Sequence, residues 1–97
     1  MIAQIVRFKS GMTGEQVLET YKERAPRYRA LKGLRQKYYL EFPDTGEHGA
    51  VYLWESETAA REFRDSELRR TIPSAYDVQG DPDIRSAEVV MLLRPDR

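Results

Sequence analysis

The sequence contains no cysteine, a single histidine and a single tryptophan. Without cysteine the chain forms neither a disulfide nor a thiolate, which fits a reducing compartment. Its 16 basic residues balance 16 acidic residues, whereas a dedicated nucleic-acid binder usually carries a strong basic excess. No apolar run approaches the ~20 residues of a membrane span, and the start MIAQIVRFKSG is too short for a signal peptide. We therefore expect a cytoplasmic protein that binds neither nucleic acid nor membrane.

The length of 97 residues is enough for one small domain, which we expect to span residues 1–97. Charged residues make up 33% and hydrophobic residues 40% of the chain, so the apolar supply is modest. A chain of this size buries only about 60–65% of the surface that its unfolded form exposes, and association with further copies is a common remedy. We therefore expect a homo-oligomer.

The first half of the chain predicts a strand followed by a helix. Residues 2–9 are rich in β-branched and aromatic types, as in a strand. Thr13 and Gln16 then have the spacing of a capping box, and apolar residues recur every three or four positions up to Gly33. Pro26 cannot donate a backbone hydrogen bond, so it predicts a kink or a break near Ala25.

Residues 34–54 predict an antiparallel hairpin around the turn sequence PDTGE. If the loop has an even length, Phe42 opposes Glu47, and His48, Ala50, Tyr52 and Trp54 share a face with Arg35, Lys37 and Tyr39. An odd length would reverse the pairing of the faces. Tyr38 belongs to the opposite face, which is the more apolar face of residues 34–42 and is joined by Gly49, Val51 and Leu53.

The second half predicts a helix, a long connection and a last strand. Ser56 caps the helix, and its inner side carries Ala59, Ala60 and Phe63. The connection over residues 66–83 is polar and turn-rich, and it is either a lid with Ile72, Pro73 and Tyr76 on a ligand or an arm around a partner subunit. Residues 84–93 predict the last strand, apolar on both faces, and the final RPDR is expected to fray.

The order of these elements is that of the ferredoxin-like βαββαβ plan, an α+β fold with a four-stranded antiparallel sheet. Its helices cover only one face of the sheet. The expected apolar last strand indicates that the second face is also buried, against a second copy of the chain.

The chain resembles the dimeric α/β-barrel proteins in this plan, in its length, in its start MIAQIVRF and in the stretch GAVYLWES before an alanine-containing helix. The branch that it resembles is that of the YdhR-type monooxygenases, with the antibiotic-biosynthesis monooxygenases as broader relatives. The resemblance implies two sheets paired face to face in a homodimer, an apolar cavity in each subunit, and oxygenation of aromatic polyketides without a cofactor. Many relatives carry a histidine on the second helix, but here the matching segment is Glu62-Phe63-Arg64. We therefore expect no haem or metal on this helix and no cofactor.

The candidate catalytic residues are His48, as the proton acceptor, and Trp54, as a hydrogen-bond donor to a substrate anion. The alternatives are that His48 faces water beside the turn and that Trp54 fills a core or an interface. Each candidate substrate-binding residue carries an aromatic ring. These rings either line a pocket for a small aromatic ligand or pack in an ordinary core: Tyr21, Tyr28, Tyr38, Tyr52, Phe63 and Tyr76. Asp81 and Asp83 are most simply solvated turn residues, and the sequence shows no metal-ligand cluster.

Three functions fit these residues. The first is a cofactor-independent monooxygenase acting on a small aromatic or polyketide-like substrate. The second is a ligand-binding or stress-associated dimer without catalysis. The third is an isomerase or lyase of the same fold, which would use the same pocket without consuming oxygen.

Overall fold

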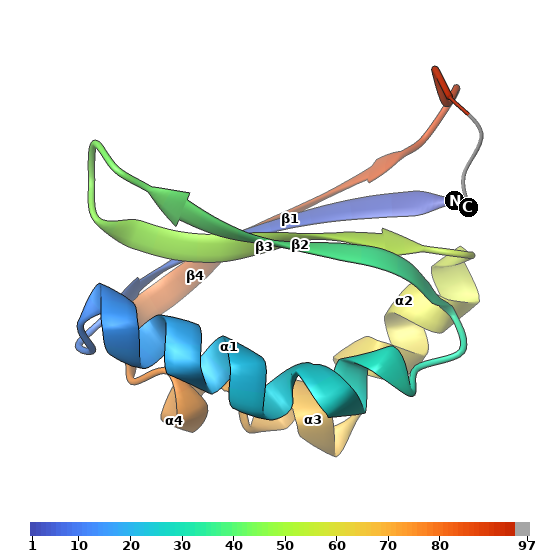
Figure 1. Ribbon diagram of the computed structural model, residues 1–97. Coiled ribbons are helices and arrows are strands. Elements are labelled where there is room, and N and C mark those ends of the chain that lie inside the picture. The colour runs from blue at the N-terminus through green and yellow to red at the C-terminus, as the bar shows by residue number, and fades with distance from the viewer. Residues whose placement is uncertain (95–97) are drawn as a thin grey trace.

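The computed structural model describes residues 1–94, and its elements follow the predicted order. The four strands are β1 (Ile2–Ser10), β2 (Leu34–Phe42), β3 (Glu47–Trp54) and β4 (Val78–Glu88). The helices are α1 (Gly14–Arg29), α2 (Glu57–Arg64) and the single-turn helices α3 (Glu67–Arg70) and α4 (Ile72–Ala75). The sheet is antiparallel in the order β2-β3-β1-β4, with the helices gathered on one of its faces (Figure 1). The ferredoxin-like α+β fold is therefore confirmed.

The helix starts lie where the capping residues predict them. The Thr13 hydroxyl accepts from the Gln16 backbone N–H at 3.2 Å, and the Gln16 side chain accepts from the Thr13 N–H at 2.9 Å. Helix α1 continues through Pro26 to Arg29, so the break considered at Ala25 does not occur. Pro26 removes only the bond that its own N–H would give to the Lys22 carbonyl, and the helix ends at Arg29 within one turn of it.

The hairpin has the register expected for an even loop, with Phe42 opposite Glu47. The loop closes through the Gly46 N–H, which donates to the Phe42 carbonyl at 2.8 Å, and Gly46 adopts the positive φ of 75° that glycine tolerates. This register puts alternate β3 side chains under the helices: His48, Ala50, Tyr52 and Trp54 are 6%, 6%, 4% and 1% exposed. The face that they form is therefore the covered face of the sheet.

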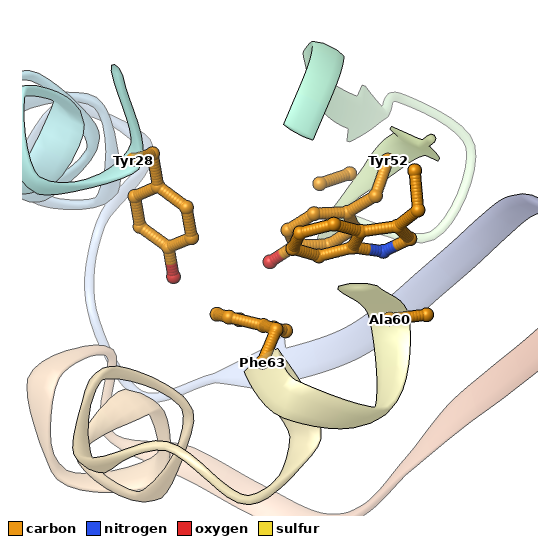
Figure 2. Close-up of a cluster of buried hydrophobic side chains, with 6 residues drawn as sticks. Tyr28, Tyr52, Ala60 and Phe63 are labelled. Atoms are coloured by element: carbon orange, nitrogen blue, oxygen red, sulfur yellow. The ribbon is translucent and has the colours of Figure 1, made fainter. Parts of the chain in front are cut away.

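Aromatic rings dominate the main buried cluster, which joins α1, β3 and α2. The Tyr52 ring stacks on Trp54 at 5.7 Å between centroids, and Phe63 lies 5.1 Å from Trp54 and 5.8 Å from Tyr28. Figure 2 shows the Tyr28 ring facing the rings of Tyr52 and Phe63 from its own element. A second cluster, of Phe8, Val17 and Tyr76, lies beneath the start of α1.

The last strand is not where the sequence predicted it. It begins at Val78 instead of residue 84 and ends at Glu88 instead of residue 93. Its polar first half is accommodated because β4 pairs only with β1, and an edge strand tolerates Pro82 and exposed carboxylates. The strand ends because β1 begins at Ile2, and the last bond runs from the Val89 N–H to the Met1 carbonyl at 2.9 Å.

The second face of the sheet carries no helix in the described part of the chain (Figure 1). Ile5 and Tyr38 on this open face are 48% and 54% exposed. Beyond β4, Val90 and Leu93 are 93% and 80% exposed, so the apolar run lies outside the sheet and the prediction of a strand apolar on both faces is wrong. Of the RPDR tail, only Arg94 lies within the described residues.

Candidate functional site

A cavity of about 310 Å³ lies between the covered face of the sheet and the helices. The four strands line it on the side of the sheet, and α1, α2, α3 and α4 with the residue that follows it line it on the side of the helices. Four tyrosines, Phe8 and Phe63 contribute rings, and most of the remaining wall is aliphatic. Lys37, Arg64 and Arg69 also line it, whereas no carboxylate does so among residues 1–94. The cavity is therefore aromatic and carries positive charge only.

Local structure explains why the tyrosines converge. Tyr21 and Tyr28 are two helical turns apart and share one side of α1, while Tyr52 points to the helices by strand alternation. Tyr76 follows the last residue of α4, whose second residue is Pro73. The connection predicted over residues 66–83 begins with a short helix capped by Ser66, as the sequence indicates, and continues with α4 and the first half of β4. Ile72, Pro73 and Tyr76 line the cavity.

The predicted aromatic residues divide into five that line the cavity and one that does not. Tyr21, Tyr28, Tyr52, Phe63 and Tyr76 are on its wall. Tyr38 was predicted to meet these residues, and this placement is wrong because Tyr38 pairs with Val51 on the open face. The apolar character of its neighbours on β2 misled the assignment, since that face is not the one under the helices.

Burial keeps the hydroxyls of three of the cavity tyrosines, Tyr21, Tyr52 and Tyr76, neutral by raising their pKa values. Burial raises the pKa of Tyr21 to about 12 and raises the pKa values of Tyr52 and Tyr76 further. The Tyr21 hydroxyl donates to the Gly49 carbonyl at 3.2 Å. The Tyr76 hydroxyl is buried and has no hydrogen-bond partner within residues 1–94, and the Tyr28 hydroxyl is buried next to that of Tyr52, whose pKa it helps to raise. Buried polar groups are normally paired, so the Tyr76 hydroxyl is available to a bound ligand.

Lys37 is the titratable group of this site that the sequence analysis missed. Its Nζ lies 3.3 Å from the centroid of the Tyr28 ring, 4.4 Å from that of Tyr39 and 4.6 Å from that of Tyr52. Its ammonium has neither an ion pair nor a hydrogen bond in the described part of the chain. Burial, and secondly the nearby charge of Arg24, lower its pKa from 10.5 to about 7. The hairpin register could have revealed it, because Lys37 lies opposite Tyr52.

Arg24 adds a second buried positive charge and ties α1 to the short helices. Its Nη2 donates to the Leu68 carbonyl at 2.9 Å and to the Thr71 hydroxyl at 3.1 Å. The side chain is 7% exposed, its Nε has no partner within residues 1–94, and its guanidinium carbon lies 5.7 Å from the centre of the Tyr76 ring.

The two predicted catalytic residues lie off the cavity wall. His48 is 6% exposed, so the alternative that it faces water is wrong, and it packs at 6.2 Å from the Phe8 ring beside a separate shallow groove. The Trp54 indole N–H donates to the Gln4 side-chain oxygen at 2.7 Å, and Gln4 lines the cavity. The catalytic roles of His48 and Trp54 stay predictions.

Within residues 1–94 there is no cluster of three or more histidine, cysteine, aspartate or glutamate side chains that could hold a metal ion. Asp81 and Asp83 lie exposed on the edge strand β4 rather than in the predicted turn. No helix of the described chain is long and apolar enough to cross a membrane.

A family model described as "Putative mono-oxygenase ydhR" matches residues 2–79 of the chain. Solved structures with the same fold include a protein of unknown function from Nitrosomonas europaea, at 15% identity and a TM-score of 0.79, covering 97% of this chain and 93% of that one. A putative antibiotic biosynthesis monooxygenase from Deinococcus radiodurans is 14% identical, with a TM-score of 0.75 and 98% of each chain covered. SnoaB, a cofactor-independent oxygenase from Streptomyces nogalater, is 11% identical, with a TM-score of 0.76 and 97% of each chain covered. No curated protein matches the chain.

Proposed function

This chain belongs to the ydhR family of putative mono-oxygenases, and on that premise we propose that it oxygenates a small phenolic or enolic aromatic compound without a cofactor. The observation that carries the proposal is the cavity of about 310 Å³ walled by four tyrosines and Phe63. This volume lies at the lower end of the range of small-molecule sites, about 300–1,000 Å³. SnoaB, described as a cofactor-independent oxygenase, has the same fold and supports the cofactor-independent form of the reaction.

The proposed chemistry uses the substrate as the source of electrons. Deprotonation of a phenol or enol gives an electron-rich anion, which transfers one electron to dioxygen. Recombination of the resulting radical pair forms a carbon–oxygen bond, and loss of water from the hydroperoxide leaves a ketone, so that R₂CH₂ and O₂ become R₂C=O and H₂O. The protein contributes a dry cavity, donors that hold the anion and a proton acceptor. The free hydroxyl of Tyr76 is suited to the donor role.

The proposal includes a homodimer in which the open faces of two sheets meet. Ile5 and Tyr38 on this face are about half exposed, and the apolar residues Val90 to Leu93 beyond β4 are exposed as well. Exposed large apolar side chains that lie on one uncovered face favour an interaction site, and a second copy offers a matching surface. Analytical ultracentrifugation at micromolar concentration is expected to give twice the chain mass, and a single-chain mass would overturn this part of the proposal.

Oxygen uptake tests the proposed reaction. Purified protein is mixed with anthrone, dioxygen consumption is followed, and incorporation of label from ¹⁸O₂ into the ketone is measured. Uptake with incorporation is the expected result. Conversion of substrate without uptake would instead indicate an isomerase or lyase, and binding without conversion would indicate a ligand-binding dimer.

A matched pair of variants assigns the activity to the cavity. Ile84 lines the cavity and is 44% exposed, whereas Leu18 lies on α1 off the cavity wall and is 50% exposed. Ile84→Trp is expected to narrow the cavity and raise KM or abolish turnover, while Leu18→Trp leaves both unchanged. Equal activity of the two variants would place the reaction elsewhere.

A further inference from the structure

We propose that Lys37 is the catalytic base of the cavity: its neutral amine takes the proton from a phenol or enol O–H of the substrate, and the resulting ammonium then holds the anion. The proposal rests on the proposed function for the reaction that follows, but the proton transfer itself can be measured alone. In this step the substrate O–H bond breaks, its electron pair stays on oxygen, and a new N–H bond forms on the Nζ of Lys37. No atom is gained or lost.

The surroundings of Lys37 permit both of its protonation states. Three rings, those of Tyr28, Tyr39 and Tyr52, lie within 4.6 Å of its Nζ and attract the ammonium form. Partial burial opposes the charge, and Arg24 on the neighbouring helix repels it. An ordinary surface lysine is almost fully protonated near neutrality and cannot accept a proton. Lys37, with its pKa near 7, is present in both forms at neutral pH.

The other charged groups around the cavity favour an anionic product. Arg24 on α1, Arg64 on α2 and Arg69 on α3 contribute positive charge to this side of the sheet. Arg29 on α1 and Arg35 on β2 line a neighbouring groove together with Lys37 and add further positive charge. The groups that face Lys37 from β3 and the end of α4 are the hydroxyls of Tyr52 and Tyr76, and the next carboxylate along its strand, Glu41, lies on the separate groove. No carboxylate of residues 1–94 on the cavity wall competes with the substrate for Lys37.

This arrangement also selects a class of substrate. Proton transfer from a simple phenol, with a pKa of about 10, to a base with a pKa near 7 is unfavourable by about three pKa units. Acyl-substituted phenols and the enols of 1,3-dicarbonyl compounds are more acidic, so their transfer to Lys37 is close to balanced. We therefore expect the substrate to carry such an activated hydroxyl, and simple phenols to bind without reacting.

The ionisation of a bound probe tests Lys37 without any oxygenase activity. The probe is 4-nitrophenol, whose phenolate is yellow, titrated against pH in the presence of saturating protein. The wild type is expected to lower the pKa of the bound probe by about one unit, because the anion is held by an ammonium in a partly buried site. Lys37→Met is expected to remove this shift, whereas Lys37→Arg retains it because its charge is permanent. The control Lys22→Met changes an exposed residue of α1 and is expected to behave as the wild type.

Turnover separates a base from a mere anion holder. Lys37→Arg holds the anion but cannot accept a proton, so its kcat is expected to be lower by about 100-fold or more. The increase of the wild-type rate with pH near pH 7 should also be absent in this variant. Lys37→Ala leaves space, and added methylamine is expected to restore part of its activity. A base acting elsewhere would show neither the loss in Lys37→Arg nor the rescue.

The outcomes for Lys37 and for the proposed function are distinct. A probe shift that is equal in the wild type and Lys37→Met, or oxygen uptake that persists in Lys37→Arg, would overturn the role of Lys37 while leaving the reaction intact. A probe shift that depends on Lys37 without uptake from any activated phenol would overturn the oxygenase and leave the site as an acid–base centre.

Discussion

Replacing Lys37 by methionine should stabilise the fold, and the gain should depend on pH in a defined direction. Burial lowers the pKa of Lys37 from 10.5 to about 7. At about 1.36 kcal/mol per pKa unit, this difference means that a charged Lys37 lowers the free energy of unfolding by at most about 5 kcal/mol. Solvent reaches the partly buried side chain, so we expect about 2 kcal/mol in practice. Methionine keeps the aliphatic packing and removes the charge.

The sign follows from the number of bound protons. Between pH 7 and 10.5 the unfolded chain keeps the Lys37 proton while the folded chain releases it, so wild-type stability rises with pH across this window. The advantage of Lys37→Met is therefore full below pH 7 and disappears towards pH 10.5. Removal of an exposed lysine should show neither effect.

Urea denaturation at pH 6.0, 7.5 and 9.0 measures this advantage, at one fixed protein concentration because association adds to stability. The fluorescence of Trp54, which is 1% exposed in the folded chain, reports unfolding. Lys22→Met serves as the control. A Lys37→Met variant that is no more stable than the wild type at pH 6.0, or whose advantage is the same at pH 6.0 and pH 9.0, would refute the electrostatic reasoning.

Four further outcomes are expected. A Cβ at Gly49 would collide with the backbone carbonyl of Val6 on the paired strand, so Gly49→Ala should lower the free energy of unfolding by about 2–4 kcal/mol, measured by urea denaturation. Thr13→Ala removes the cap of α1 and should cost about 1 kcal/mol in the same assay, and an unchanged midpoint would contradict the capping geometry. Tyr38→Asp places a charge on the open face and should shift the sedimenting species towards single chains without changing the circular dichroism spectrum. His48→Ala should keep kcat/KM within about threefold because His48 lies off the cavity wall, whereas a loss of about 100-fold would restore its role as the base and contradict that of Lys37.

The local elements of this fold could be predicted from short-range signals. The Thr13 capping box and the alternation along residues 47–54 were correctly identified, because each depends on contacts within a few residues or on strand periodicity. The even loop fixed the hairpin register, and with it the shared face of His48, Tyr52 and Lys37.

The errors arise where distant parts of the chain decide the outcome. The last strand was predicted up to the apolar residues 89–93, but its end is set by the pairing with β1, in which Ile2 lies opposite Glu88. Tyr38 was placed in the core because its strand face is apolar, whereas the helices cover the face that carries Lys37. The alternation of residues along a strand does not show which face of the sheet the helices cover, so the sequence did not single out Lys37 as a residue of the site.

The edge strand β4 limits how copies of the chain can associate. Its free side carries Pro82, which has no N–H to offer, between the carboxylates of Asp81 and Asp83. A strand of another molecule would therefore gain few ladder bonds there and would meet like-signed repulsion from any acidic neighbour. In the proposed dimer the two sheet faces are self-complementary and the contact ends at two copies, so the polar border of β4 disfavours the addition of further copies at this edge.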